Sequence, residues 1–568
     1  MSGSSGPNLR WILIAAALCA TLIIPIAWDS SQNWIFPDSI SYLDMASDAV
    51  HGSLSVLVKN AYWGPAYPAA LALMMAVFRP ALADELRAAY VVHWILYLFA
   101  TACFSVFWVS LFRWLRDSAW KELAQDSTME AAWLCFGYGF FFLVNMNQTL
   151  WYLTPDMLLQ GTVYLSAAFA IRLFLPGSSW KHSAALGLCL GLGYLTKSAM
   201  FPAALFLLGI LFLRPPQGGL GPRHSLIAMA CFFLMAAPLV LSLSLEKHRF
   251  TFGDSGKLNY AMVVGDVPYC AGWTGQNPAY GVPLHAPRKI NDYPVILEFR
   301  TPVSGTLPLW YDASYWYEGL RVPISLERQL AGFLRPFKQV HTTQSIFLAF
   351  VLALSPLSLL SSRARALICE GGIRLWILIV WPGMVCLMYA MVLFTMRYVV
   401  GYLVLAALGF VSIGLQCLSR NARVRALFGA SLLLAAVALL HLRPVVGATL
   451  HPADSGLLTR EQGRDNAASS AAVARELGRL GIRPGDEISA LGHTLDCYYA
   501  RLAGVRIVAQ IWEDPDQIVD LRADQVLNVL AKLKQLGVKA LVSRGKPGFM
   551  NDNGWVPVAR TDVYVRIL

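Results

Sequence analysis

Apolar runs near the roughly 20 residues that a helix needs to cross a bilayer recur along the first 445 residues of the chain. The composition agrees with this pattern, since 57% of the residues are hydrophobic, only 14% are charged, and the mean hydropathy is +0.52. A soluble domain is about 45–50% apolar and about 25% charged. The sequence therefore predicts a polytopic α-helical membrane protein.

About eleven transmembrane helices are predicted, at 11–28, 88–112, 130–147, 156–175, 183–197, 199–213, 225–245, 344–360, 375–394, 398–416 and 426–442. The first run follows Arg10 and is not followed by a convincing A-x-A cleavage site. We interpret it as an uncleaved anchor and not as a signal peptide.

A further apolar run at 64–80 is short and has two prolines near its start. If it lies along the external interface, the loops that become cytoplasmic are all basic, as the positive-inside rule requires. These loops are 113–121, 176–182, 214–224, 361–374 and 419–425. We therefore expect a multi-pass protein of the inner (plasma) membrane with a cytoplasmic N-terminus and an external C-terminus. Many arginines behind the net charge of +11 then act as topology signals, and no nucleic-acid partner is expected.

The expected organisation is a transmembrane domain over 1–445 and a small external α/β domain over 450–568. The transmembrane domain includes a first external loop at 29–87 and a large external loop at 246–343. In the tail, helices and strands of short length alternate, which predicts a layer of mainly parallel strands. Its glycines do not follow the order of a dinucleotide site, so no cofactor is expected there. The ten cysteines contain no CxxC pair and support neither a disulfide framework nor a zinc site.

The first external loop carries three aspartates in the stretch "WIFPDSISYLDMASDAVHG", at positions 38, 44 and 48. Asp38 follows Pro37 and precedes a helical pattern, so it can be read as a helix N-cap. Asp156 follows Pro155 and can be read in the same way. A capping carboxylate beside the membrane is also a positioned base, so the two interpretations are compatible.

Four ionisable groups fall at the external ends of apolar runs: Asp38, Asp156, Lys197 and Arg397. Taken singly, each is explained as a cap or as a side chain that reaches the interface. Two acids and two bases around one external cleft instead suit a reaction in which a hydroxyl loses a proton and a phosphate leaves.

The segments "FPDSISY", "GPAYPAALAL", "TPDMLL", "GLGYLTK" and "RYVVGYLVLAALGF" follow one another in the chain. In their order and common side they resemble the GT-C type membrane glycosyltransferases, in the protein O-mannosyltransferase and aminoarabinose-transferase branch. The resemblance implies catalytic roles for Asp38 and Asp156, and binding of the donor phosphate by Lys197, Arg397 and Tyr398. The family often has two adjacent acids in the first loop, whereas Ser39 follows Asp38 here. It therefore stays open whether Asp44 or Asp48 assists.

The chemistry that the resemblance implies is external transfer of a sugar from a polyprenyl-phosphate donor to a hydroxyl of a glycan, lipid or protein acceptor, with inversion. Asp38 would be the general base, and the partners would be membrane lipid, donor and acceptor. The sequence contains no HExxH motif, and its Asp514-x-Asp516 pair lies in the tail. We therefore expect no catalytic metal and no cofactor besides the lipid-linked donor.

Aromatic residues cluster in "GTLPLWYDASYWYEG", residues 305–319 of the large loop. They suit either an interfacial aromatic belt or a lid over a polyhydroxylated ligand. The possible sugar or acceptor contacts are Tyr42, Asp44, Trp310, Tyr311, Asp312, Tyr315 and Trp316. The segment 251–261, "TFGDSGKLNYA", is predicted to form a strand and a turn.

Two other functions are compatible with a polytopic chain. A transporter tends to have charged or broken helices near the midplane and related halves, but here the charges lie at one face and no repeat is found. A membrane-anchored sensor or scaffold that uses the tail would leave the four ionisable groups unexplained.

Overall fold

The computed structural model describes residues 8–24, 28, 34–118, 127–216, 221–268, 273–322, 324–338, 376–416, 419–450, 466–492, 494–515, 518, 521–546 and 554–568. The predicted span at 344–360 and Asp516 lie outside these residues.

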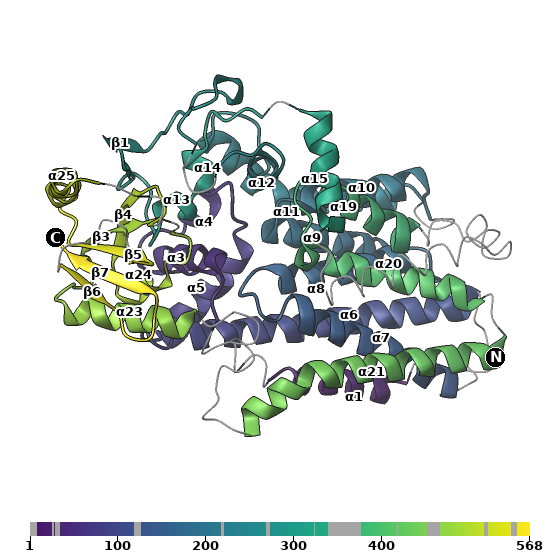
Figure 1. Cartoon of the computed structure of the whole chain (residues 1–568). Helices are drawn as coiled ribbons and strands as arrows, with labels where there is room; N and C mark the ends of the chain where they lie inside the picture. The colour runs from purple at the N-terminus through teal and green to yellow at the C-terminus, as the bar shows by residue number, and fades with distance from the viewer. Residues whose placement is uncertain are drawn as a thin grey trace.

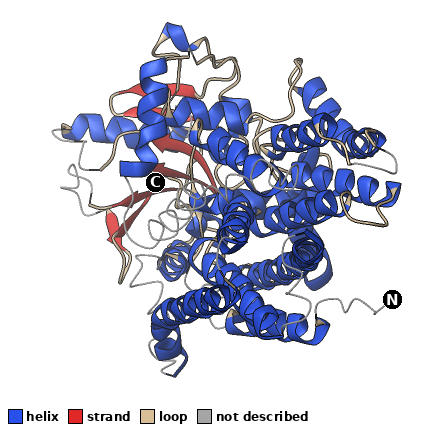
Figure 2. Ribbon diagram, turned by 90° about the vertical axis from the view of Figure 1, so that its right-hand side faces the viewer, coloured by secondary structure: helices blue, strands red, loops and turns tan. Residues whose placement is uncertain are grey.

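Long helices form most of the molecule, and a sheet lies at one end of it (Figures 1 and 2). The helices of the bundle are α1 (Leu9–Leu22), α6 (Glu85–Ser118), α7 (Ser127–Gln148), α8 (Asp156–Arg172), α9 (Trp180–Thr196), α10 (Met200–Leu213), α11 (Arg223–Glu246), η3 (Trp376–Val380), α19 (Trp381–Ala390), α20 (Met396–Gln416) and α21 (Arg420–Leu450). Among the described residues, five helices are long and apolar enough to cross a membrane, namely those within α6, α7, α11, α20 and α21. The helical membrane class is thus confirmed, while the count of eleven spans stays a prediction.

The ambiguous apolar run at 64–80 forms the 13-residue helix α5 (Ala66–Phe78). At 1.5 Å per residue it is about 20 Å long, shorter than the roughly 30 Å hydrocarbon core. Arg79 ends it in the left-handed conformation. The helix packs on α3 (Pro37–His51), where the rings of Tyr67 and Tyr42 meet edge to face at 5.1 Å. This length agrees with the prediction of a segment that does not span.

The described residues form one seven-stranded sheet of order β1-β2-β4-β3-β5-β7-β6. Its strands are β1 (Arg288–Asp292), β2 (Val295–Glu298), β3 (Glu487–Leu491), β4 (Arg506–Ile511), β5 (Ala540–Arg544), β6 (Trp555–Pro557) and β7 (Val563–Ile567). Only β3 pairs in parallel, with β4 and β5, and the other pairs are antiparallel. The three strands that the sequence predicts in the tail, β3, β4 and β5, do pair in parallel, and the antiparallel pairs come from β1, β2, β6 and β7, which it does not predict.

The hairpin β1–β2 belongs to the large loop at 246–343, yet it extends the sheet of the tail through β2 and β4. The α/β layer is thus built from both segments that the sequence treats as separate. Strand partners far apart in the chain leave no local signal, which is why the sequence predicts the individual strands of the tail and misses this pairing.

The two faces of the sheet pack differently, because successive strand residues point to opposite sides. Ile488, Ile507 and Val542 lie in the hydrophobic core that continues into the helical bundle and includes α23 (Ala467–Arg479). Val508 and Leu541, their neighbours in the chain, pack against α25 (Ala523–Gln535) in a second core. The sheet is therefore anchored to the bundle through one face of strands β3, β4, β5 and β7.

Candidate active site

Asp38 lies in the first turn of α3, whose first residue is Pro37. Phe36 occupies the N-cap position and no side chain caps the helix, so the N-cap interpretation of Asp38 is wrong. The carboxylate instead accepts hydrogen bonds from Arg397 Nη2 at 3.1 Å and from Trp310 Nε1 at 3.3 Å. A proline and an acid in the first turn suit a helix start, because φ is preset and the helix dipole favours negative charge there.

Asp156 is the first residue of α8 and does not cap it, since Pro155 is at the N-cap position without a capping bond. Its carboxylate is buried and accepts from Lys197 Nζ at 2.5 Å and from Thr154 Oγ1 at 2.7 Å. Arg397 Nη1 lies 3.8 Å from Asp156 Oδ2. Asp156 therefore holds both cations that the sequence singles out.

Lys197 follows the last residue of α9, where the backbone turns extended and the side chain leaves the helix. Its Nζ lies 3.6 Å from the centroid of the Tyr398 ring, a distance at which the ring attracts a cation. The ammonium is thus fixed between a carboxylate and an aromatic face.

Arg397 is near the start of α20, and its guanidinium lies 4.4 Å from the ring centroid of Phe36, 5.1 Å from that of Tyr152 and 5.0 Å from that of Tyr398. These rings and Asp38 set the orientation of the guanidinium. Within the described part of the chain, its buried Nη1 has no hydrogen-bond acceptor. Asp156 Oδ2 faces this atom at 3.8 Å, too far for a hydrogen bond, so Nη1 is paired in charge but makes no hydrogen bond.

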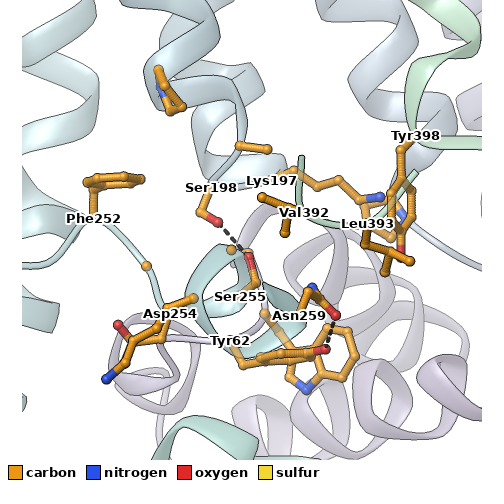
Figure 3. A pocket seen from close by; sticks show the side chains of 18 of the residues that line it. Tyr62, Lys197, Ser198, Phe252, Asp254, Ser255, Asn259, Val392, Leu393 and Tyr398 are labelled. Atoms are coloured by element: carbon orange, nitrogen blue, oxygen red, sulfur yellow. Dashed lines mark hydrogen bonds between the residues drawn. The ribbon is translucent and has the colours of Figure 1, made fainter. Parts of the chain in front are cut away.

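A cavity of about 400 Å³ is lined by Asp38, Tyr42, Lys197, Arg397 and Tyr398 of the predicted residues. The structure therefore brings the four ionisable groups together around one cavity, with Asp156 behind the two cations. Its other wall is formed by the segment after α4 (Val56–Lys59) and by residues 249–259. Figure 3 shows Lys197 beside Tyr398, with Tyr62 and Asn259 on the other side.

Residues 249–259 are functional candidates that the sequence interpretation missed. They contain the start of α12 (Ser255–Val263), so the prediction of a strand and a turn is wrong. Asp254 precedes this helix and binds Arg249 at 2.5 Å and Thr251 Oγ1 at 3.0 Å, which orders the chain before it. The feature of the sequence that could have indicated a functional segment here is the run of small and polar residues in "TFGDSGKLNYA".

Hydrogen bonds hold this wall against the site. Ser255 Oγ lies 2.7 Å from Ser198 Oγ, next to Lys197, and the Tyr62 hydroxyl donates to Asn259 Oδ1 at 3.2 Å (Figure 3). Gly253 has φ +133° and approaches so closely that a Cβ would lie 2.7 Å from Ser198 Cβ. A side chain at this position would therefore push the wall away from Lys197.

The aromatic segment 305–319 forms two short helices, α13 (Pro308–Tyr311) and α14 (Ala313–Trp316). Trp310 contacts Asp38, and its carbonyl accepts from Ser41 Oγ at 3.2 Å and Trp63 Nε1 at 3.3 Å. Trp310 is therefore part of the support of the carboxylate, while Tyr42 lines the cavity directly.

The other expected sugar contacts are engaged elsewhere. The Tyr311 hydroxyl donates to Asp48 Oδ2 at 2.7 Å, and Asp312 accepts from the Tyr315 N–H at 3.2 Å. The Trp316 Nε1 donates to the Pro308 carbonyl at 2.9 Å. The cavity-lining residues of the described chain do not include Asp44, Tyr311, Asp312, Tyr315 or Trp316. The polar contacts of these residues lie within the loop 305–319 or join it to α3 and the tail, so they support the fold beside the cavity.

Asp44 belongs to a separate buried network, which we call the domain network and which consists of Asp44, Glu85, Thr306 and Arg501. Arg501 Nη1 lies 2.5 Å from Asp44 Oδ1, and its Nε and Nη2 bind Glu85 at 2.7 and 2.6 Å. Thr306 donates to Asp44 through its N–H at 2.7 Å and its hydroxyl at 2.8 Å. The network joins the first loop, the large loop and the C-terminal tail.

The helical bundle with its α/β layer has the fold of the GT-C type membrane glycosyltransferases. The chain is similar to ArnT from Cupriavidus metallidurans in the apo state, at 13% identity and a TM-score of 0.53 over 98% of both chains. ArnT from the same organism bound to undecaprenyl phosphate gives 13% identity and a TM-score of 0.52, again over 98% of both chains. The oligosaccharyltransferase of Archaeoglobus fulgidus gives 11% identity and a TM-score of 0.47 over 94% of this chain and 68% of that one. The fold that the resemblance implied is confirmed.

No protein-family model matches the chain, and no curated protein matches it in sequence.

Proposed function

We propose that the protein is a membrane glycosyltransferase that moves a sugar from a polyprenyl-phosphate donor to an acceptor hydroxyl. The observation that carries this proposal is that a carboxylate and two cations line one cavity, with Arg397 Nη1 buried and lacking an acceptor among the described residues. The similar fold of ArnT, which has been solved with undecaprenyl phosphate, supports a donor with this type of carrier.

Lys197 and Arg397 would bind the phosphate that leaves the sugar. A guanidinium can engage two phosphate oxygens at once, and charge-assisted bonds are about twice as strong as neutral ones. Nη1 of Arg397 is the donor still available, and Lys197 Nζ lies next to it through their shared partner Asp156. Negative charge that develops on the phosphate as the bond breaks is stabilised by both.

Asp38 would act as the general base. Its carboxylate takes the proton of the acceptor hydroxyl, whose oxygen attacks the anomeric carbon opposite the phosphate. The bond from that carbon to the phosphate oxygen breaks, its electron pair leaves with the phosphate, and the anomeric centre inverts. Arg397 now bonds Asp38 Oδ2. A substrate phosphate at the guanidinium would compete for this N–H group. Binding of the lipid-linked sugar would therefore free the Asp38 carboxylate to act as a base.

Asp156 would position the cations and not touch the sugar. Its side chain is 1% exposed, and its oxygens bond to Lys197 and Thr154. This differs from the direct catalytic role that the family resemblance implies for it.

The wall formed by Tyr62, Lys257 and Asn259 would contact the sugar or the acceptor. A ring face, an ammonium and an amide are groups that bind a polyhydroxylated or polar ligand through stacking and hydrogen bonds. The acceptor would be a glycan, a lipid or a protein, with no nucleic acid involved.

The site would open on the external side of the inner membrane, as the basic loops require. A reporter fused after residue 568 should then be accessible from outside intact spheroplasts. A cytoplasmic reporter would contradict the orientation and separate Asp38 from the compartment of an external acceptor.

The proposal is tested by incubating the purified protein with a panel of polyprenyl-phosphate sugars and measuring release of the free carrier phosphate. Turnover with at least one donor, lost in Asp38→Asn, is expected. If no donor is turned over, while proteoliposomes take up or flip a lipid-linked substrate intact, the protein is a transporter and the proposal fails.

A further inference from the structure

Helix α3 carries Asp38 in its first turn, and the C-terminal domain contacts the chain on both sides of this residue. On one side Asn466, at the start of α23, binds Ile35. On the other side Arg501 binds Asp44 and the carbonyl of Leu43. The proposed base is thus bracketed by two contacts that come from a separate part of the chain.

The contact at Ile35 involves both backbone groups of that residue. The Asn466 side-chain oxygen accepts from the Ile35 N–H at 3.0 Å, and its amide donates to the Ile35 carbonyl at 2.8 Å. These two opposed bonds engage the peptide units on both sides of Ile35, so they restrict the backbone rotation of this residue as well as its position. Ile35 lies three residues before Asp38, so this pair sets how the chain enters α3.

The contact at Asp44 is the domain network. The side chains of Asp44, Glu85 and Arg501 are 6%, 7% and 7% exposed, so their charges are paired almost without water. Removing one partner from such a pair is strongly destabilising, because it leaves a buried charge without compensation. Arg501 therefore holds α3 tightly to the C-terminal domain, less than two turns after Asp38.

The second partner of Asp38, Trp310, depends on the same domain. The loop before it is tied to β4, since Phe299 N donates to the Val508 carbonyl and Ile507 N donates to the Thr306 carbonyl, both at 2.9 Å. Thr306 in turn binds Asp44. Both the backbone that carries the carboxylate and the indole that orients it are thus fixed by the C-terminal domain.

We infer that the C-terminal domain is a positioning device for the base, with Asn466 and Arg501 as the positioning residues. The inference rests on the proposed function for its catalytic meaning. It explains why a lipid-dependent enzyme would carry an external α/β domain whose residues lie outside the cavity wall described above.

Asp44→Asn and Glu85→Gln form a matched pair that tests this. Each variant neutralises one of the two carboxylates that bind Arg501. Asp44 lies on α3 with Asp38, whereas Glu85 begins α6. Because small misplacements of a reacting group are costly, Asp44→Asn should lower kcat roughly tenfold with the donor KM unchanged. Glu85→Gln should lower the Tm to a similar degree and leave kcat within about twofold. Equal losses of kcat in both variants would show a role in stability alone and overturn the inference.

Hydrogen exchange of the α3 amides provides a readout that needs no turnover. Asp44→Asn should speed exchange at residues 39–44, and Asn466→Asp, which cannot donate to the Ile35 carbonyl, should do the same at the start of α3. Glu85→Gln should not. If the wild type turns over no donor, the proposed function fails, and this pattern still decides whether the domain positions α3. Unchanged exchange in both Asp44→Asn and Asn466→Asp would refute the inference.

Discussion

Two buried charge clusters each include one carboxylate of α3, and in each an arginine lies between two carboxylates. In the site, Arg397 lies between Asp38 and Asp156; in the domain network, Arg501 lies between Asp44 and Glu85. The network is closed, with all three side chains at most 7% exposed. The site is more open, because Asp38 is 16% and Lys197 is 17% exposed, and both line the cavity.

The use of hydrogen-bond donors separates the two clusters. Arg501 uses Nε, Nη1 and Nη2, each bound to a carboxylate oxygen. Arg397 uses Nη2 and leaves Nη1 without an acceptor in the described chain. A guanidinium whose donors are all bound has none left for a ligand, while a cavity-lining guanidinium with a donor that makes no hydrogen bond can bind one. The comparison shows that charge and burial alone do not distinguish a closed structural cluster from a candidate binding site.

The charge state of the network follows from the same contacts. Burial raises the pKa of Asp44, against the opposing effects of Arg501 and Thr306. Burial alone would lower the pKa of Arg501, but Asp44 and Glu85 outweigh it and raise that pKa. Arg501 therefore keeps its charge at any pH at which the protein is folded.

The largest effect is expected for Arg501→Met, which leaves two buried carboxylates without their cation. Removing one partner of a buried pair costs about 3–5 kcal/mol, so we expect a large fall of Tm in detergent. Lys197→Met is the control from the other cluster and should cost clearly less stability. A Tm of Arg501→Met equal to that of the wild type would contradict the closed nature of the network.

Asp38→Asn should reduce transfer by roughly a hundredfold or more, because an amide cannot accept the proton. The Tm should stay near that of the wild type, since the shape is kept and Asp38 is not a cap. Asp48→Asn, on the same helix but bound to Ser304 and Tyr311, is the control and should retain most activity. Full transfer by Asp38→Asn would rule out the general base.

Lys197→Met should lower kcat/KM for the donor by about 10- to 100-fold, the value of a hydrogen bond to a charged group, about 1.5–3 kcal/mol. Carrier turnover at several donor concentrations measures this effect. If kcat/KM is unchanged, Lys197 serves only as the counter-charge of Asp156, and the site resembles the domain network.

The smallest effect is expected for Trp310→Phe, which removes one neutral donor from Asp38. Such a bond contributes about 0.5–1.5 kcal/mol, so kcat should fall about two- to tenfold. The ring packing against Trp63 is largely kept, which makes the change in Tm small. A loss as large as that of Asp38→Asn would mean that Trp310 takes part in the reaction more directly than we propose.

The sequence predicts the clustering of the four ionisable groups better than it predicts the sheet. Asp38, Asp156, Lys197 and Arg397 could be grouped because the basic loops assign their span ends to one side of the membrane. The partner of Asp44 could not be predicted, since Arg501 lies in the tail and no local pattern links them. The wall at 249–259 has a local signal in its small polar residues, but its place beside the cavity depends on contacts with Ser198 and Tyr62, which lie in other loops.

The pairing of β2 with β4 also affects how the chain is made. Glu298 faces Ala509 across the sheet, so the hairpin emerges from the ribosome about 200 residues before its partner. At about 5–20 residues per second this interval is on the order of 10–40 s. During that time one edge of the hairpin has no strand beside it, and an open edge can pair with another chain. Only when the tail has been synthesised can β4 pair with β2 and the sheet close.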